Sequence, residues 1–391
     1  MLFKLEKRYW FAIISKILVV GISLLVSIFI NRGLGVELKG EYTYIINLVE
    51  LLYIILCFSL GQTYSTFKKK MGEKIDSTFV ILTLAHSITV LIAGLIIVQF
   101  VNADNGYAIV ILTALSIANA NFTMLAVIKD SVKRNAIVTV SNIVYLLLLA
   151  FLFVIDRFSL TNVLICYGIN ELINISAFIK EYKLFSFKQP MLKSEIKNIY
   201  STALITTVAV LLISINYKVD TLMLRNMAGK YNLGLYSVAV NFSNMFLLIP
   251  DAFKEVIFGD STEKDFSKKT ALNAIRVSFI VAGIIVIGFA VFGKFAIKLL
   301  YGADYVPSYA TTLILFIGSI SMIFFKILHP IYIADGKQKK AVLFLACSGV
   351  FNIVANYFLI PIYTHNGAAI ASAISYTVCG LLFMLDYMKE K

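Results

Sequence analysis

Long apolar stretches follow one another along almost the whole chain, separated by short polar segments rich in Lys, Gly and Asn. Each stretch holds about twenty residues, which is the length that an α-helix needs to cross the hydrocarbon layer of a bilayer. The pattern predicts twelve spans, at residues 10–30, 41–61, 78–100, 106–127, 136–155, 160–180, 198–219, 235–257, 273–293, 309–334, 341–361 and 366–386. Because no polar segment between them is long enough to fold alone, we predict a polytopic membrane protein.

The backbone chemistry of the spans predicts their secondary structure. In lipid, only helices and closed barrels satisfy every backbone N–H and C=O group, and the alternating ten-residue pattern of barrel strands is not found in this sequence. The composition agrees, since 60% of the residues are apolar and only 15% are charged. We therefore predict an all-α bundle.

The net charge of +13 suggests an acidic partner until the positions of the charges are considered. Lys and Arg gather in alternate polar segments, around residues 4–8, 68–74, 129–134, 180–197, 264–269, 337–340 and 389–391. An excess of Lys and Arg in short loops marks the cytoplasmic side of a membrane protein. We therefore expect both termini in the cytoplasm, a charge that orients the chain, and no nucleic-acid partner.

The polar segment between spans 1 and 2 is echoed between spans 7 and 8. At a constant offset of 194 residues, Gly35, Gly40, Tyr42 and Asn47 match Gly229, Gly234, Tyr236 and Asn241. The echo predicts two lobes of six spans, residues 1–190 and 191–391. Because six is an even number, both lobes enter the membrane from the same side and the repeat is parallel.

Several turn motifs resemble one family of carriers. They are Arg32-Gly-Leu-Gly with Gly40-Glu-Tyr, Val219-Asp220, Gly234-Leu-Tyr-Ser-Val-Ala, Tyr301-Gly-Ala-Asp-Tyr, Ile360-Pro-Ile-Tyr and Asn366-Gly-Ala-Ala-Ile-Ala. These motifs look like the polysaccharide-exporter branch of the MOP superfamily. The length and the twelve spans are most similar to its Wzx-type flippases of O-antigen and capsule repeat units.

The resemblance implies a fold and a function. The fold is two six-helix lobes around a central cavity lined by spans 1, 2, 7 and 8. The function is to flip undecaprenyl-pyrophosphate-linked oligosaccharide repeat units from the cytoplasmic to the outer leaflet by alternating access, coupled to a proton or sodium gradient. The protein would lie in the bacterial cytoplasmic (inner) membrane among membrane lipids, serve lipopolysaccharide or capsule synthesis, and have the repeat-unit polymerase as a partner.

Polar side chains inside the spans are the candidate site residues, because ionisable groups at membrane depth are expensive and usually face a cavity. Those expected to line the substrate cavity are Lys16, Asn47, Glu50, Asn216, Lys218, Asn241, Asn244 and Lys326. Those expected to couple transport to an ion are Glu50, Glu171 and Asp220.

Other interpretations of these charges stay open. Lys16 and Lys326 are able to extend to the headgroups rather than into a cavity. Lys218 and Asp220 are able to form an interfacial pair, and Glu171 to pair within its own lobe. Glu50 is able to form a structural pair with Lys16.

Two other classes of protein fit the sequence less well. A cation-coupled drug exporter of the same superfamily would carry an acidic residue in span 1, where this chain has Lys16. A membrane glycosyltransferase or polymerase would need a large outer loop with catalytic carboxylates or arginines, and every outer loop here is short. The motifs of ATP hydrolysis and of zinc sites do not occur, and the four Cys residues fall in four different spans. We therefore expect a transporter without catalytic residues, metal or cofactor.

Overall fold

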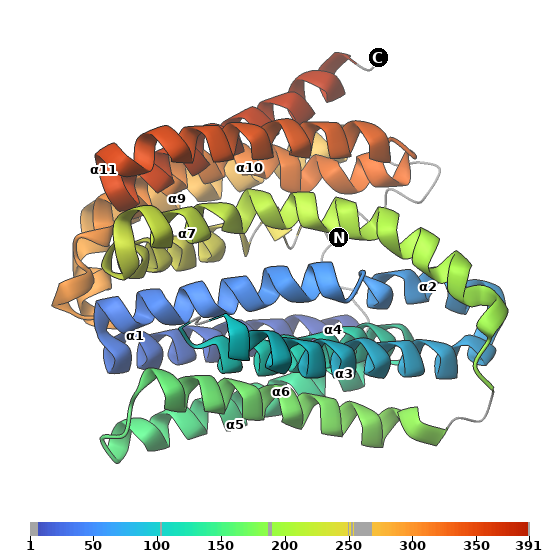
Figure 1. Ribbon diagram of the computed structural model, residues 1–391. Coiled ribbons are helices and arrows are strands. Elements are labelled where there is room, and N and C mark those ends of the chain that lie inside the picture. Colours follow the sequence, from blue (N-terminus) through green and yellow to red (C-terminus); the bar gives the residue numbers. More distant parts are fainter. Residues whose placement is uncertain are drawn as a thin grey trace. The chain divides into compact units, whose positions relative to one another are not determined.

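The computed structural model describes residues 7–101, 104–186, 190–248, 250–251, 253 and 268–389, and these residues form helices joined by short turns (Figure 1). Side chains of residues 7–17, 19, 186, 268 and 269 lie outside the description. The α-helices are α1 (Lys7–Leu56), α2 (Leu60–Met71), α3 (Asp76–Phe100), α4 (Gly106–Lys129), α5 (Ser131–Val154), α6 (Leu160–Tyr182), α7 (Ile196–Phe246), α9 (Lys268–Leu300), α10 (Ser308–Ala334) and α11 (Gln338–Lys389). Short 3-10 turns occupy η1 (Gly72–Ile75), η2 (Leu184–Ser186), η3 (Lys193–Glu195) and η4 (Ala303–Tyr305).

The chain forms two compact units. Unit 1 holds the described residues up to Leu34 and from Ile45 to Leu211, and unit 2 holds Gly35–Tyr44 and the described residues from Leu212 onward. The two longest helices of the N-terminal and central chain, α1 and α7, therefore contribute to both units. Each unit is described by itself below.

Eight helical stretches in the described residues are long and apolar enough to cross a membrane. Three of them carry several predicted spans in succession: Val20–Phe100 holds the second half of span 1 and all of spans 2 and 3, Lys193–Phe246 holds span 7 and the first half of span 8, and Gln338–Lys389 holds spans 11 and 12. The remaining five stretches carry one predicted span each. The prediction of an all-helical polytopic membrane protein is confirmed.

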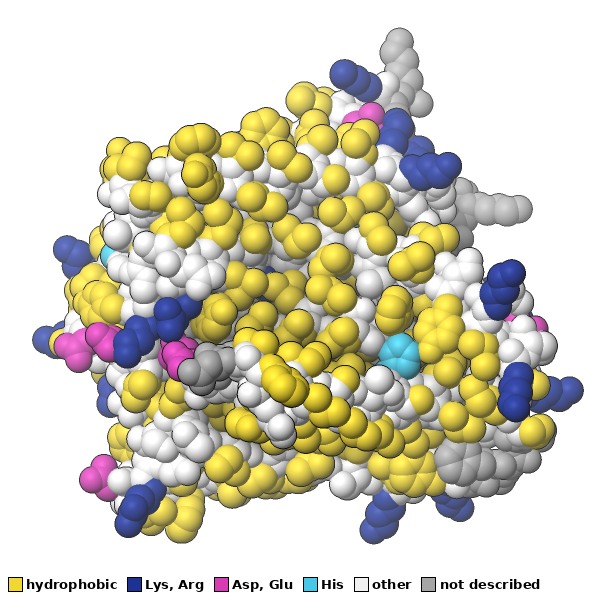
Figure 2. Space-filling model, viewed as in Figure 1, with side chains coloured by type: hydrophobic (Ala, Val, Ile, Leu, Met, Phe, Trp, Pro, Cys, Tyr) yellow, Lys and Arg dark blue, Asp and Glu magenta, His cyan; other side chains and the backbone are white. Residues whose placement is uncertain are grey.

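Apolar side chains face outward along these helices. On α3, Ile88, Ile92 and Ile96 repeat every four residues and each is more than half exposed, and Ile280 and Ile284 do the same on α9. In Figure 2 hydrophobic side chains cover most of the visible helical surface, whereas Lys and Arg gather near helix ends. A stripe of exposed isoleucines at helical spacing is the face that lipid chains cover.

Three long helices are interrupted by a single residue. Gly35 in α1 (φ 68°, ψ 176°) and Gly229 in α7 (φ 83°, ψ 172°) share one backbone conformation, which is almost restricted to glycine. The hydroxyl of Tyr236 bonds Asp220, although 16 residues of straight helix would separate them by about 24 Å. The helix α7 therefore turns back on itself at Gly229.

The interruption of α11 falls at Thr364, which is not a glycine (φ 50°, ψ −125°). A Cβ added at Gly367 would come within 2.2 Å of the carbonyl oxygen of Leu359, eight residues earlier. Straight helix would hold these residues about 12 Å apart, so the two arms of α11 run back against each other (Figure 1).

A fourth interruption separates α1 from α2 inside predicted span 2. Phe58 and Ser59 both have positive φ, and the N–H of Leu60 bonds Cys57 rather than the carbonyl of Leu56. His86 on α3 donates from Nδ1 to this carbonyl at 2.8 Å, which leaves its Nε2 to accept from the hydroxyl of Tyr200 on α7 at 2.7 Å. Side chains of unit 1 thus satisfy backbone groups that lipid would leave unpaired.

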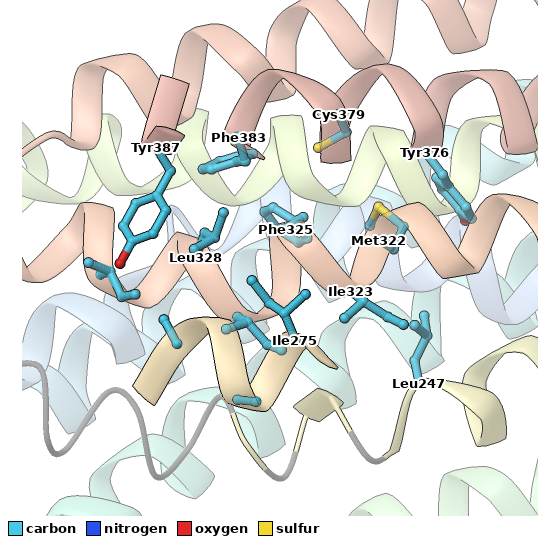
Figure 3. Close-up of a cluster of buried hydrophobic side chains, with 14 of the residues drawn as sticks. Leu247, Ile275, Met322, Ile323, Phe325, Leu328, Tyr376, Cys379, Phe383 and Tyr387 are labelled. Carbon is cyan, nitrogen blue, oxygen red and sulfur yellow. The ribbon is translucent and has the colours of Figure 1, made fainter. Parts of the chain in front are cut away.

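The core of unit 2 lies between α9, α10 and the second arm of α11 (Figure 3). Phe383 is fully buried there, with its ring 5.1 Å from that of Tyr332 and 5.4 Å from that of Phe325. Figure 3 shows side chains of α10 and α11 pointing toward one another along this contact, with Ile275 of α9 beneath them. This packing fixes the arm of α11 that carries Ser372 and Ser375.

Candidate functional site

Asp220 is the most deeply buried carboxylate among the described residues, with a relative exposure of 1%. Its Oδ2 accepts hydrogen bonds from the hydroxyls of Tyr236 and, at 2.9 Å, Ser372, and its Oδ1 accepts from the backbone N–H of Thr221 at 2.6 Å. These donors come from both arms of α7 and from α11, so the turn at Gly229 and the packing of α11 together build the site. A buried carboxylate is stable only when it is bonded in this way.

Asn216 lies one helical turn before Asp220 and is also buried. Its Nδ2 donates to the carbonyls of Leu212 at 3.0 Å and Leu345 at 2.8 Å, and its Oδ1 accepts from the hydroxyl of Ser348 at 2.8 Å. The amide of Asn216 is therefore saturated, and it ties α7 to α11.

Two further asparagines extend the polar groups of unit 2 along α11. Asn352 and Asn356 are fully buried, and Nδ2 of Asn356 donates to Oδ1 of Asn352 at 2.8 Å. Within the described part of the chain, Nδ2 of Asn352 and Oδ1 of Asn356 have no hydrogen-bond partner. One donor and one acceptor thus remain available inside an apolar unit.

Lys326 in α10 forms an ion pair inside unit 2. Its Nζ lies 2.9 Å from the carboxylate of Asp251 and 5.6 Å from the ring centre of Tyr217. The two side chains are 15% and 32% exposed, so the pair is largely shielded. An opposite charge and an aromatic face together hold an ammonium group at a depth where it would otherwise be unstable.

Glu171 is the corresponding buried carboxylate of unit 1, with a relative exposure of 6%. Asn119 and Tyr167 face its carboxyl group. Its Oε2 has no hydrogen-bond partner among the residues that the structure describes. Asn174, one turn further along α6, is buried as well, and its Oδ1 lacks a partner within the same range.

The other predicted site residues occupy less buried positions. Asn47 and Glu50 in α1 and Lys218 and Asn241 in α7 are half-buried, and Asn244 is exposed. The side chain of Lys16 lies outside the described residues. The structure thus places Asn216 and Asp220 on one turn of α7, Lys326 elsewhere in unit 2, and Glu171 in unit 1. The functional roles of all ten predicted site residues stay predictions.

The two echoed turns meet inside unit 2. A Cβ on Gly40 would lie 1.8 Å from the carbonyl oxygen of Lys230, and a Cβ on Gly234 would lie 2.0 Å from that of Val36. Val36 and Lys230 differ by the same 194 residues as Gly40 and Gly234, so the contact is reciprocal, as in a two-fold interface. The guanidinium of Arg225 lies 2.8 Å from Glu41 and adds an ion pair to it.

Sequence reasoning missed several of these partners. Asp251 lies in predicted span 8, and an acidic residue there was a usable signal for a partner of Lys326. Tyr236 was noticed only as a match in the repeat, and Ser372 gave no signal, because an isolated Ser in an apolar span is common. The described residues include no group of His, Cys, Asp and Glu that is able to hold a metal ion.

Turned-back apolar helices with buried carboxylates define the class of the chain as a polytopic helical membrane protein. A family model described as "Polysaccharide biosynthesis protein" matches residues 7–252, which is more than half of the sequence. The chain belongs to this family. No curated protein matches it.

Solved structures share its fold. The lipid II flippase MurJ in an inward closed conformation matches with a TM-score of 0.74 at 14% identity, over 96% of this chain and 88% of that one. An inward-facing multidrug resistance MATE transporter matches with a TM-score of 0.70 at 13% identity, over 94% of this chain and 93% of that one. A MOP superfamily transporter from Pyrococcus furiosus matches with a TM-score of 0.64 at 14% identity, over 96% of this chain and 94% of that one. At these identities the likeness concerns the fold alone. The family match and this shared fold together confirm the predicted resemblance to polysaccharide exporters of the MOP superfamily.

Proposed function

We propose that this chain flips a lipid-linked saccharide, carrying undecaprenyl-pyrophosphate-linked oligosaccharide repeat units from the cytoplasmic to the outer leaflet by alternating access. The observation that carries the proposal is the polysaccharide biosynthesis family match over residues 7–252. Polar groups inside apolar helices support it. A pyrophosphate and its sugars need such groups to cross hydrocarbon, whereas a prenyl tail is able to stay in lipid.

The setting of this function is part of the proposal. The protein would lie in the bacterial inner membrane with both termini in the cytoplasm and two lobes divided at residues 190 and 191. It would serve O-antigen, lipopolysaccharide or capsule synthesis, with the repeat-unit polymerase as a partner. The alternate Lys and Arg clusters of the sequence support the orientation.

Three carboxylates are the proposed carriers of a coupling proton or sodium ion: Glu50, Glu171 and Asp220. Glu171 and Asp220 are among the described buried residues, and an ionisable group enclosed by apolar helices is a functional candidate. Asn47, Asn216, Lys218, Asn241, Asn244 and Lys326 are proposed to face the saccharide at some stage of the cycle.

Lys16 is proposed to receive the pyrophosphate, and the sequence alone supports this role. An ammonium group on a flexible stem attracts the negative oxygens of a diphosphate as a point charge. Lys16→Arg should therefore retain surface polysaccharide, whereas Lys16→Gln should lose it at equal protein abundance in the membrane. Normal export by Lys16→Gln would mean that the lysine only reaches the headgroups.

The decisive experiment for the function is deletion in the native host. A flippase mutant should accumulate complete lipid-linked repeat units that face the cytoplasm, as tested by their accessibility to a label in sealed spheroplasts. Incomplete repeat units would instead indicate an enzyme of repeat assembly.

A drug exporter of the same superfamily is the second candidate, favoured by the fold shared with the multidrug MATE transporter. It would extrude ethidium from cells and leave surface polysaccharide unchanged on deletion. Lipid-linked repeats that accumulate without any change in ethidium efflux would exclude it.

A further inference from the structure

A pocket of about 450 Å³ opens between the end of α2 and the beginning of α7, both parts of unit 1. Its polar lining comes from Lys70, Glu195, Asn198, Ser201 and Thr202, and Phe67 forms part of its apolar wall. The volume falls in the range of roughly 300–1,000 Å³ that is typical of small-molecule sites. None of these residues belongs to the groups described above.

Helix geometry explains why the pocket has two chemically different sides. Phe67 and Lys70 are three residues apart on α2, and Asn198 and Ser201 are three residues apart on α7, so each pair shares one helix face. The α2 side supplies the cation of Lys70 above the buried ring of Phe67, and the α7 side supplies an amide and a hydroxyl.

The polar groups of the pocket are only partly used by the protein itself. Nδ2 of Asn198 donates to Glu195 at 3.0 Å, and the hydroxyl of Thr202 donates to the backbone carbonyl of Asn198 at 3.0 Å. In the described part of the chain, no side-chain hydrogen bond or ion pair engages the ammonium of Lys70 or the hydroxyl of Ser201. Donors and acceptors therefore both remain for a ligand.

This combination selects among ligand classes. The lining holds one ammonium group, on Lys70, and one carboxylate, on Glu195, so a phosphate or a cationic drug would be attracted by one of them and repelled by the other. A sugar ring presents hydroxyls that both donate and accept, and it carries no net charge. The lining of the pocket matches the sugar.

The position of the pocket matches the same ligand. It lies beside Lys68, Lys69 and Lys70 in the last turn of α2, a polar helix that begins where predicted span 2 (41–61) ends. The saccharide of a membrane lipid stays at this interface, because burying its hydroxyls in hydrocarbon without partners is unfavourable.

We propose that this pocket is a saccharide-binding site, which holds the sugar of the lipid-linked substrate at the membrane interface before it is moved. The identity of the ligand rests on the proposed function, and the location of the site rests on the pocket between α2 and α7.

Binding of two lipids to the purified full-length chain in nanodiscs tests the proposal. One probe is the undecaprenyl-pyrophosphate-linked oligosaccharide extracted from the deletion host, and the other is undecaprenyl pyrophosphate without sugar. The test variant Asn198→Ala/Ser201→Ala removes an amide and a hydroxyl from the pocket. The control variant Gln62→Ala/Ser65→Ala removes the same kinds of group from exposed positions of α2 outside the pocket.

The test variant should bind the saccharide-bearing lipid about tenfold more weakly, since two hydrogen bonds are lost. Its binding of the sugar-free lipid, and both affinities of the control, should stay within about twofold of the native chain. Lys70→Gln keeps a donor and should bind the saccharide-bearing lipid within about threefold of the native chain.

Other outcomes would overturn the proposal in distinguishable ways. Equal loss of both lipids in Lys70→Gln would make the pocket an anion site, whether for a lipid headgroup or for the pyrophosphate. Unchanged affinities in Asn198→Ala/Ser201→Ala would make it a solvated surface, while the proposed function would stand. A native chain that binds neither lipid would refute the proposed function itself, and the saccharide site with it.

Discussion

At the scale of single residues, the charges inside the helices differ in how completely the protein satisfies them. The carboxylate of Asp220 accepts from Tyr236, Ser372 and the backbone of Thr221, whereas Oε2 of Glu171 has no donor among the described residues. A saturated carboxylate mainly organises its surroundings, whereas one with an open oxygen is easier to change without disturbing the fold.

This difference predicts unequal effects of amide substitution. Asp220→Asn places an NH2 group among hydrogen-bond donors, and it should destabilise the chain by about 1–3 kcal/mol. Glu171→Gln should destabilise it by less than about 1 kcal/mol, since one oxygen has no bond to lose. Thermal unfolding of both variants in one detergent measures the order. If Glu171 is the coupling residue, transport by Glu171→Gln in vesicles will also lose its dependence on the gradient.

The ion pair of Lys326 and Asp251 predicts a compensated double variant. Removal of one partner leaves the other charge unpaired in a shielded place, so Lys326→Met should destabilise the chain by about 1–3 kcal/mol. Lys326→Met/Asp251→Leu should recover more than half of that loss, as measured by the melting temperature. A double variant no more stable than Lys326→Met would show that the pair is not what holds Lys326.

Transport by the same double variant separates two roles of Lys326. A stable double variant that no longer exports would place Lys326 in contact with the substrate. Normal export would leave it as a structural residue.

At the scale of elements, the turns at Gly35 and Gly229 explain why the internal repeat could be detected in the sequence. Their backbone conformation requires glycine, and the close approach at Gly40 and Gly234 leaves no space for a Cβ. The geometry of the two turns therefore requires glycine at matching positions, and these glycines are visible in the sequence. The interruption at Thr364 adopts a positive φ without glycine and left no such signal.

The reciprocal contact predicts equal effects at its two ends. Gly40→Ala and Gly234→Ala each drive a methyl group into a backbone carbonyl, which has little freedom to move, and each should lower the melting temperature by a similar amount. Gly283→Ala in α9 is the matched control, because a Cβ there meets nothing within 4 Å. It should stabilise its helix by up to about 1 kcal/mol. Strongly unequal losses at Gly40 and Gly234 would contradict the reciprocal packing.

At the scale of the whole molecule, the apolar spans could be predicted because bilayer thickness fixes the length of every span. The superfamily was indicated separately, by the resemblance of several turn motifs to its members. The hydrogen-bond and ion-pair partners of the polar side chains inside the units could not be predicted. Lys326 and Asp251 are 75 residues apart, and Asn216 and Ser348 are 132 apart, so only the packed helices decide that they meet. Sequence position shows that a charge lies in a span, whereas tertiary structure decides what satisfies it.

The predicted orientation of the chain depends only on the Lys and Arg clusters in its alternate polar segments, and reporter fusions test it. Lys and Arg resist transfer across the membrane, so the loops that carry their clusters should stay in the cytoplasm. A reporter that is active only in the cytoplasm should work when fused after residues 70, 134 and 338. It should fail after residues 104, 157, 230 and 304, where a reporter active only outside should work instead. Because consecutive spans must alternate in direction, one reproducible reversal at an interior position would remove a span from the predicted twelve.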